Sequence, residues 1–185
     1  VLRALAGAAS LDGIALITRD AEAELMAAEY GATITPEAEN GGQTAAVSHG
    51  IQQLMARGVE TIVQIPGDVP LVTPTEIEQV IAAHLPAPAM TIVPARDEQG
   101  SNCVICSPPD SVTLRFGDNS FFPHLEAARR GGISPTIVPL AGLGLDIDTA
   151  ADLEAVLARP AETASHTFLR DSGVAARFQL ELRSA

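Results

Sequence analysis

Short apolar runs alternate with segments of helical periodicity along most of this 185-residue chain. The apolar runs are rich in Val, Ile and Thr, so they predict strands at residues 14–18, 32–35, 61–65, 90–94, 103–107, 136–140 and 143–147. The periodic segments predict helices at residues 21–30, 43–57, 73–84 and from 148 onward, with another that follows a loop at 116–123 and ends at 129–132. Strands alternating with helices predict one α/β domain with a largely parallel sheet.

Individual residues support several of these boundaries. Asp20 is placed to cap the helix that follows it. The segment from Thr73 to Glu76 has the form of a capping box, with Pro74 at the first helical position. Residues 61–65 show no alternation, which is typical of a central parallel strand covered on both faces.

The domain is expected to occupy residues 1–159, followed by an Ala-rich helical tail at residues 160–185 with helices at about 166–170 and 174–178. Apolar residues make up 46% of the chain, which is typical of a globular domain and too many for a disordered one. A chain of this length buries a core that needs no disulfide or metal. It opens at Val1, within an apolar helical pattern.

The charge of the chain excludes several functions. All 11 basic side chains are Arg and stand against 23 acidic ones, for a net charge of −12. Such a surface repels polyanions, so we expect no binding to nucleic acid or to an anionic membrane. No apolar run reaches the roughly 20 residues that span a bilayer, and we recognise no signal peptide, so we expect a cytoplasmic protein. A phosphate substrate would need a divalent cation or a local cluster of Arg.

Cys103 and Cys106 form a C-x-x-C pair, a spacing also found in zinc and redox sites. The pair lies in a predicted strand, where residues three apart point to opposite faces. We therefore interpret both as buried thiols of a reducing compartment. Structural roles are likewise expected for the four histidines, which show no metal-ligand spacing: His49, His84, His124 and His166.

Acidic residues follow two of the predicted strands, at the sheet edge where open α/β folds bind ligands. Asp68 comes directly after residues 61–65 in a stiff Pro-Gly-Asp-Val-Pro turn, and a carboxylate fixed there suits Mg²⁺. Asp146 and Asp148 would share one face of a strand end, so either could supply a second carboxylate. Capping a turn or a helix is the alternative for Asp68 and Asp148. Asp146 lies within an apolar run and is the preferred second ligand.

Three Gly-rich loops could seat an anion or a nucleotide base. The loop from Gly41 to Thr44 precedes a helix, whose free N–H groups suit either ligand. Residues 100–102 and 116–120 combine Gly with hydroxyl side chains, and Arg96 and Arg115 lie beside them. The alternative is that these Gly and hydroxyl residues only stabilise turns and that Arg96 and Arg115 are surface residues without a ligand.

Four motifs in a fixed order narrow the interpretation. They are Pro66-Gly67-Asp68-Val69-Pro70-Leu71, Gly100-Ser101-Asn102, Arg115-Phe116-Gly117-x-x-Ser120 and Asp146-x-Asp148-Thr149-x-x-Asp152-Leu153. From residue 1 to about residue 157 this set resembles the phosphoenolpyruvate / 2-phospho-L-lactate guanylyltransferases of deazaflavin coenzyme (factor 420) biosynthesis. The resemblance implies the GT-A-like fold of the nucleotidyltransferase superfamily, which is a single Rossmann-like α/β domain with a mostly parallel mixed sheet flanked by helices.

The resemblance also implies roles for individual residues. The implied catalytic residues and Mg²⁺ ligands are Asp68 and Asp146, and we add Asp148 as a third candidate carboxylate of the metal site. The implied contacts of the phosphorylated three-carbon acid are Ser101, Gly117 and Ser120, and we add Arg96 and Arg115, which lie beside these loops. The implied contacts of the guanine nucleotide are Gly42, Gln43 and Thr44, and we add Pro66 and Gly67.

The implied reaction joins GMP from GTP to phosphoenolpyruvate or 2-phospho-L-lactate and releases pyrophosphate. The attacking phosphate is already ionised at neutral pH, so no general base is required. Two alternatives remain: a related nucleotidyltransferase that acts on a molybdopterin or a sugar phosphate, and a non-catalytic nucleotide-binding domain. A homodimer is compatible with the sequence, which does not determine the oligomeric state.

The chain departs from the family pattern at four places. Ser101 stands where Thr is usual, Thr44 where Asn is common, and Ala95 where an Asp usually precedes Arg96. Family members also begin with a strand and a Lys-containing loop that handles the nucleotide phosphates, whereas residues 1–9 match the helix after that loop. We therefore expect the first strand and the phosphate loop to be missing from this chain.

Overall fold

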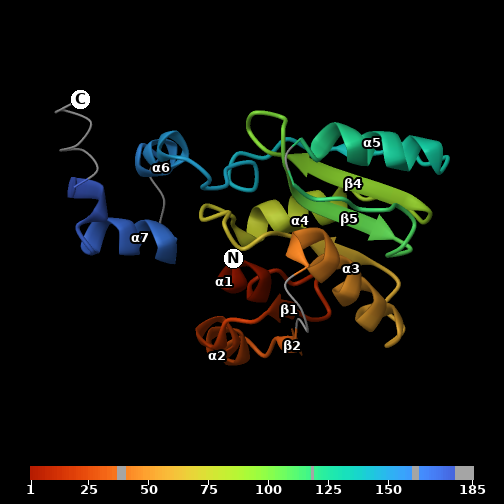
Figure 1. Ribbon diagram of the computed structural model, residues 1–185, viewed down its shortest axis with the longest axis horizontal. Helices are drawn as coiled ribbons and strands as arrows, with labels where there is room; N and C mark the ends of the chain where they lie inside the picture. The colour runs from red at the N-terminus through yellow and green to blue at the C-terminus, as the bar shows by residue number, and fades with distance from the viewer. Residues whose placement is uncertain (37–40, 118, 160–162, 178–185) are drawn as a thin grey trace.

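The computed structural model describes residues 1–36, 41–117, 119–159 and 163–177 (Figure 1). Its elements are, in chain order, α1 (Leu2–Ala6), β1 (Ala15–Thr18), α2 (Ala21–Glu29), β2 (Thr33–Pro36), α3 (Gly42–Met55), β3 (Ile62–Gln64), α4 (Pro74–Ala82), β4 (Ala89–Pro94), β5 (Ser101–Ser107), α5 (Phe121–Arg130), β6 (Thr136–Ile137), α6 (Ala150–Leu157) and α7 (Ala164–Asp171).

The strands form a mixed arrangement between flanking helices (Figure 1). A four-stranded sheet has the order β3-β5-β4-β6, and β1 pairs with β2 in a two-stranded sheet. The pairs β1–β2 and β4–β6 are parallel, whereas β3–β5 and β4–β5 are antiparallel. The expected mixed α/β fold is therefore confirmed.

One detail of that expectation is wrong, because β3 is not a central parallel strand. It ends the order of its sheet and runs antiparallel to β5, with Ile62 opposite Cys106. Its apolar character has another cause: Ile62 packs into one core cluster, while Val63 and Ile65 pack against the other. A lack of alternation thus indicates cover on both faces of the strand and carries no information about its direction.

Two apolar clusters cover the two faces of the four-stranded sheet. One contains Ile92 and Val104 with α3 and α5, and the other contains Val93 and Ile105 with α1 and α4. Figure 1 shows α4 and α5 on opposite sides of the β4–β5 pair. Side chains of adjacent residues enter opposite clusters, as the period of a strand requires.

Cys103 and Cys106 are both buried free thiols, as expected. Cys103 belongs to the α1/α4 cluster and Cys106 to the α3/α5 cluster, so they face opposite sides of the sheet. Burial raises the pKa of the Cys106 thiol to about 12 and that of Cys103 still further. Neither thiol is therefore poised for metal binding or redox chemistry.

Residues 143 and 144 belong to a turn and residues 145–147 have no regular secondary structure, so the strand predicted at 143–147 does not form. The backbone N–H groups of Gly142 and Leu143 donate to the Glu76 carboxylate at 2.7 and 3.1 Å. A Cβ atom on Gly142 would collide with the carbonyl oxygen of Leu71, so only glycine permits this approach. Glu76 thus anchors the turn, and Thr73 caps α4 without the reciprocal bond of a capping box.

Two other boundaries differ from the prediction. Strand β6 covers only two residues of the predicted 136–140. Helix α5 begins at Phe121, so Pro123 lies in its first turn, where its missing N–H group costs nothing. In the tail, α7 and residues 174–177 are helical as expected, and residue 178 lies outside the described residues. A domain boundary at residue 159 stays a prediction.

A cavity of about 840 Å³ lies between β1 and β3 and is also lined by α1 and α3. Its walls are mainly aliphatic, and Gln43 and Asp68 stand among its polar members. The chain ahead of β1 forms α1, which agrees with the helical pattern at residues 1–9. The absence of a strand and phosphate loop before that helix stays a prediction. None of the described helices is long and apolar enough to cross a membrane.

Candidate functional site

Asp68 lies in the turn that follows β3, between the buried residues Val69 and Pro70 and the carboxyl end of the strand. Its backbone carbonyl oxygen accepts a hydrogen bond from the Ile147 N–H at 3.1 Å. This bond joins the turn after β3 to the segment that carries Asp146 and Asp148. Both predicted acidic segments therefore meet at one place.

The carboxyl of Asp68 has a raised pKa. Burial is the largest cause, and the negative charges of Asp146 and Asp148 raise it further. The side chain still reaches solvent at the cavity wall. A cation at this place would neutralise the negative charges that act on Asp68.

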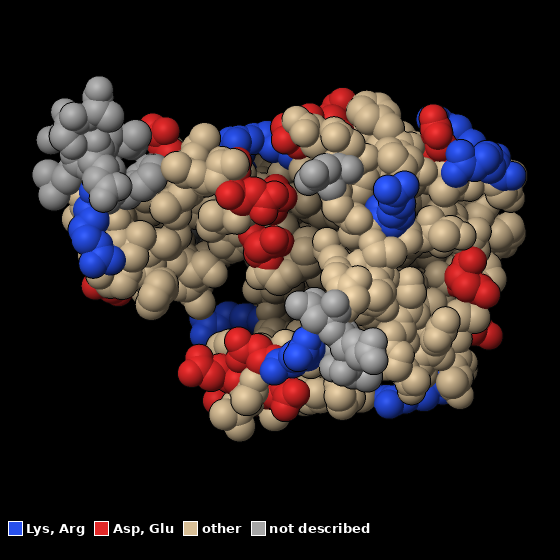
Figure 2. Space-filling view, viewed as in Figure 1, with Lys and Arg blue, Asp and Glu red and all other residues tan. Residues whose placement is uncertain are grey.

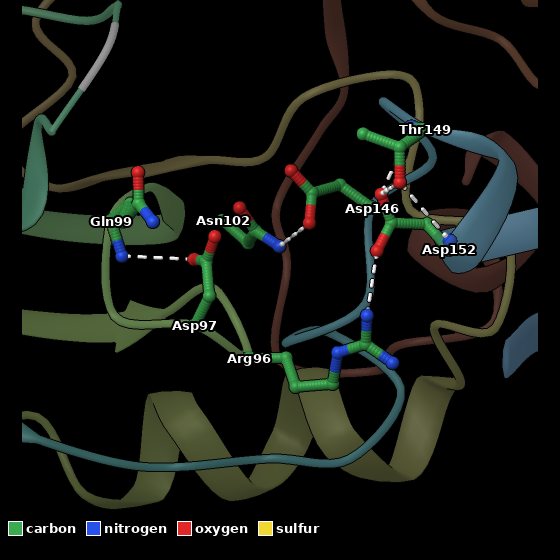
Figure 3. Close-up of polar contacts among 7 residues, drawn as sticks. All are labelled: Arg96, Asp97, Gln99, Asn102, Asp146, Thr149 and Asp152. Atoms are coloured by element: carbon green, nitrogen blue, oxygen red, sulfur yellow. Dashed lines mark hydrogen bonds and ion pairs between the residues drawn. The ribbon is translucent and has the colours of Figure 1, made fainter.

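Asp146 is half-buried and accepts a hydrogen bond from the Asn102 side chain, with Nδ2 to Oδ1 at 3.1 Å. Figure 3 shows these two side chains facing one another, Asn102 from β5 and Asp146 from the segment before α6. The bond leaves the second carboxylate oxygen of Asp146 available to a ligand. Asp146 lies in a segment without regular secondary structure rather than at a strand end, so strand alternation does not position it.

Helix α6 begins without Asp148 as its cap. Thr149 is the N-cap residue and forms a complete capping box with Asp152. Asp152 also pairs with Arg96, whose Nη2 lies 2.7 Å from Oδ1 (Figure 3). Arg96 therefore ties the loop after β4 to the start of α6. Although Ala95 stands where the family usually has an Asp before this Arg, Arg96 still forms an ion pair, with Asp152. The pairing turns Arg96 toward α6.

The described residues contain no group of three or more His, Cys, Asp or Glu side chains that could hold a metal ion alone. Asp68 and Asp146 nevertheless provide the hard oxygen ligands of a Mg²⁺ site, because Mg²⁺ takes only one or two carboxylates and fills its other positions with water and substrate phosphate. The charges of Asp146 and Asp148 add to the effect of burial on the pKa of Asp68, and such an ion would offset those charges. The donor set fits the metal.

Ser101 and Ser120, the two predicted substrate hydroxyls, are buried side by side. Ser120 Oγ donates to Ser101 Oγ at 3.3 Å. Ser101 begins β5 and Ser120 precedes α5, so the bond joins the sheet to the start of that helix. His124, with an exposed fraction of 0%, contacts Ser101 through Nδ1 at 2.9 Å. Sequence reasoning assigned His124 no part in this cluster.

Thr44 holds the loop that contains Gly117 in place. Its hydroxyl accepts from the Phe116 N–H at 2.9 Å and donates to the Phe116 carbonyl oxygen at 3.1 Å. The Thr44 hydroxyl is thus engaged by the chain itself and not turned toward the cavity. Gly117 has a φ of +124°, a conformation that favours glycine. Arg115 lies exposed beside it.

Two adjoining cavities meet at Asp68. The 840 Å³ cavity brings together four of the predicted nucleotide and metal residues, namely Gln43, Pro66, Gly67 and Asp68. A second cavity of about 460 Å³ is lined by Gly67 and Asp68 on one side and by α7 residues on the other, among them Ser165 and Phe168. The sequence offered no signal that α7 would border this site. Figure 2 shows acidic side chains at the margin of a hollow in this face of the molecule.

The fold has a counterpart among solved structures. A cytidylyltransferase structure from Leptospira borgpetersenii superposes with a TM-score of 0.58 at 16% identity, covering 84% of this chain and 71% of that one. The same α/β framework therefore serves nucleotidyl transfer elsewhere.

Sequence comparison then defines the family: the chain belongs to the family described as "Guanylyl transferase CofC like", which matches residues 1–184. A phosphoenolpyruvate guanylyltransferase of Sphaerobacter thermophilus is 34% identical over 154 residues, which are 83% of this chain and 73% of that protein. A 2-phospho-L-lactate guanylyltransferase of Methanothermobacter thermautotrophicus is 32% identical over 111 residues, 60% of this chain and 48% of that protein. The protein is thus an enzyme of the nucleotidyltransferase class, which typically depends on a metal ion.

Proposed function

We propose that this protein joins GMP from GTP to a phosphorylated three-carbon acid, phosphoenolpyruvate or 2-phospho-L-lactate, with release of pyrophosphate. The observation that carries the proposal is that Asp68 and Asp146 interact at the edge of the sheet where the buried Ser101 begins β5. Relatives whose names state these acceptors support it. Asn102 connects the acidic residues to the serine pair, because it follows Ser101 in β5 and donates to Asp146.

Mg²⁺ is the cofactor that this donor set suits, and Asp68 and Asp146 would hold it, with Asp148 next to them. When bound, the ion supplies positive charge that offsets the repulsion between two anionic substrates. Asn102 keeps one oxygen of Asp146 engaged and so orients its carboxylate. The bond from the Ile147 N–H to the Asp68 carbonyl oxygen holds the turn that carries Asp68.

The reaction is an in-line substitution at the α-phosphorus of GTP. A phosphate oxygen of the acceptor forms the new bond to this phosphorus, and the bond to the pyrophosphate oxygen breaks. Because the acceptor oxygen already carries charge, the chain needs to position it rather than to deprotonate it. In this proposal Ser101, Ser120 and the backbone at Gly117 position the acceptor, and Gln43, Pro66 and Gly67, which line the larger cavity, contact the nucleotide.

A screen of pyrophosphate release tests the proposal. The full chain is combined with GTP, CTP or UTP and with phosphoenolpyruvate, 2-phospho-L-lactate, 3-phosphoglycerate or a sugar phosphate, in the presence of Mg²⁺. We expect turnover with GTP and a three-carbon acid. Turnover confined to a sugar phosphate would support the alternative acceptor class, and no turnover with any pair would support a non-catalytic nucleotide-binding domain.

The carboxylate assignment has its own test. Asp68→Asn and Asp146→Asn should abolish turnover while both variants still fold and unfold cooperatively, and Asp110→Asn, at an exposed position, serves as the matched control. Full activity of either site variant with Mg²⁺ would overturn the metal assignment. A homodimer also stays a prediction, and sedimentation of the full chain measures it.

A further inference from the structure

A buried histidine links the two segments of the proposed acceptor site. His124 lies in the first turn of α5, and its ring packs edge-on against Phe116 with the centroids 5.1 Å apart. One ring nitrogen, Nε2, accepts the backbone N–H of Arg115 at 2.8 Å. The other, Nδ1, lies 2.9 Å from Ser101 Oγ. The imidazole therefore bridges the loop at 115–117 and the first residue of β5.

These contacts determine the protonation of the ring. A backbone N–H can only donate, so Nε2 must carry a lone pair. A neutral imidazole with an unprotonated Nε2 carries its hydrogen on Nδ1, which therefore donates to Ser101 Oγ. Burial favours this neutral form, since it lowers the pKa of His124 to about 4.

The same reasoning fixes the hydroxyl of Ser101. A serine hydroxyl accepts at two lone pairs and donates one hydrogen. Ser101 Oγ accepts from His124 and from Ser120, so its own hydrogen must be given elsewhere. Among the described residues no acceptor for that hydrogen is recorded. A buried donor without an acceptor is costly, and an anionic ligand would relieve the cost.

Ser101 lies at the same edge of the sheet as the acidic residues, which suits an anionic ligand. Gln64 pairs with Val104, so Ser101 lies beyond the carboxyl end of β3, where Asp68 follows. The next residue, Asn102, bonds Asp146. The backbone of residues 101 and 102 therefore places Ser101 and the partner of Asp146 at the same edge of the sheet.

We propose that His124 is a positioning residue, which makes the Ser101 hydroxyl an outward donor to the anionic acceptor and fixes the loop at 115–117 around it. This inference rests on the proposed function, because the acceptor is the phosphorylated acid named there. It predicts that His124 affects the binding of the acceptor and not that of GTP.

The ring state is tested without any assay of activity. In the full chain, ¹⁵N chemical shifts of the His124 imidazole at neutral pH should report a neutral ring with hydrogen on Nδ1. Hydrogen on Nε2, or a doubly protonated ring, would overturn the proposal whatever the enzyme does.

Kinetics test the role toward the acceptor, with phosphoenolpyruvate and GTP varied in turn. His124→Leu should raise the KM for phosphoenolpyruvate about tenfold or more and leave the KM for GTP within twofold. His124→Asn, whose amide reaches the position of Nδ1, should recover part of the loss. His124→Leu combined with Ser101→Ala should be no worse than Ser101→Ala alone, because one residue acts through the other.

The matched control is the His–Ser pair at the far end of β5. His84 bonds Ser107 Oγ through Nε2 at 2.8 Å and Thr91 Oγ1 through Nδ1 at 2.9 Å. His84→Leu should lower stability and leave both KM values unchanged. Equal rises in both KM values for His124→Leu, or additive effects with Ser101→Ala, would overturn the positioning role. A wild-type chain without turnover on any phosphorylated acid would instead refute the proposed function, and with it the acceptor of this inference.

Discussion

The buried imidazole of His124 makes stability depend on pH in a predictable direction. The unfolded chain takes up the proton with a pKa near 6.5, whereas burial lowers the pKa in the folded protein to about 4. Between these values the unfolded state binds more protons, so the free energy of unfolding falls as the pH falls. The contribution is fully present above pH 6.5 and is lost by about pH 4. A shift of this size corresponds to about 3 kcal/mol.

The assay is urea unfolding of the wild type and of His124→Gln at several pH values from 7 to 4. The variant is less stable at neutral pH, so the quantity that matters is the slope against pH. The raised pKa of Asp68 acts in the opposite sense, since a carboxyl that is harder to ionise in the folded state gains stability as the pH falls. That effect is common to both proteins and cancels in the difference. The two curves should converge as the pH falls from 6.5 to 4, and parallel curves would refute the reasoning.

Four further predictions follow from single contacts. Glu76→Gln should lower the free energy of unfolding by about 1–3 kcal/mol, because two backbone N–H groups lose a charged acceptor, and urea midpoints measure it. Gly142→Ala should destabilise by more than Gly13→Ala, whose added Cβ meets nothing within 4 Å, and comparable losses in the two variants would contradict the collision with Leu71. Both thiols should resist alkylation until the chain unfolds in urea, and rapid labelling of the native protein would contradict their burial. Without divalent cations, Asp68→Asn should raise the free energy of unfolding, since it removes a carboxylate whose pKa is raised by burial and by two like charges.

Local patterns predicted the elements of this fold better than their pairing. The cap at Asp20 lies where the sequence places it, because it depends on residues within one turn. The direction of β3 was mispredicted, since it depends on hydrogen bonds to β5 about 40 residues away along the chain. The capping box expected at Glu76 fails for the same reason: its carboxylate finds better donors at Gly142 and Leu143.

In the candidate site, two residues that were expected to lie close together do so through a different contact from the one predicted. Asp146 was expected near Asp68 through the alternation of a strand, yet its segment is not a strand, and the bond from the Ile147 N–H to the Asp68 carbonyl oxygen brings the two together. His124 was assigned a structural role because spacing along the chain reveals metal ligands and nucleophiles but not a ring that bonds partners 9 and 23 residues away. Side chains that orient other side chains leave no local pattern. A buried polar residue beside predicted ligand-binding hydroxyls is therefore worth testing as part of the site.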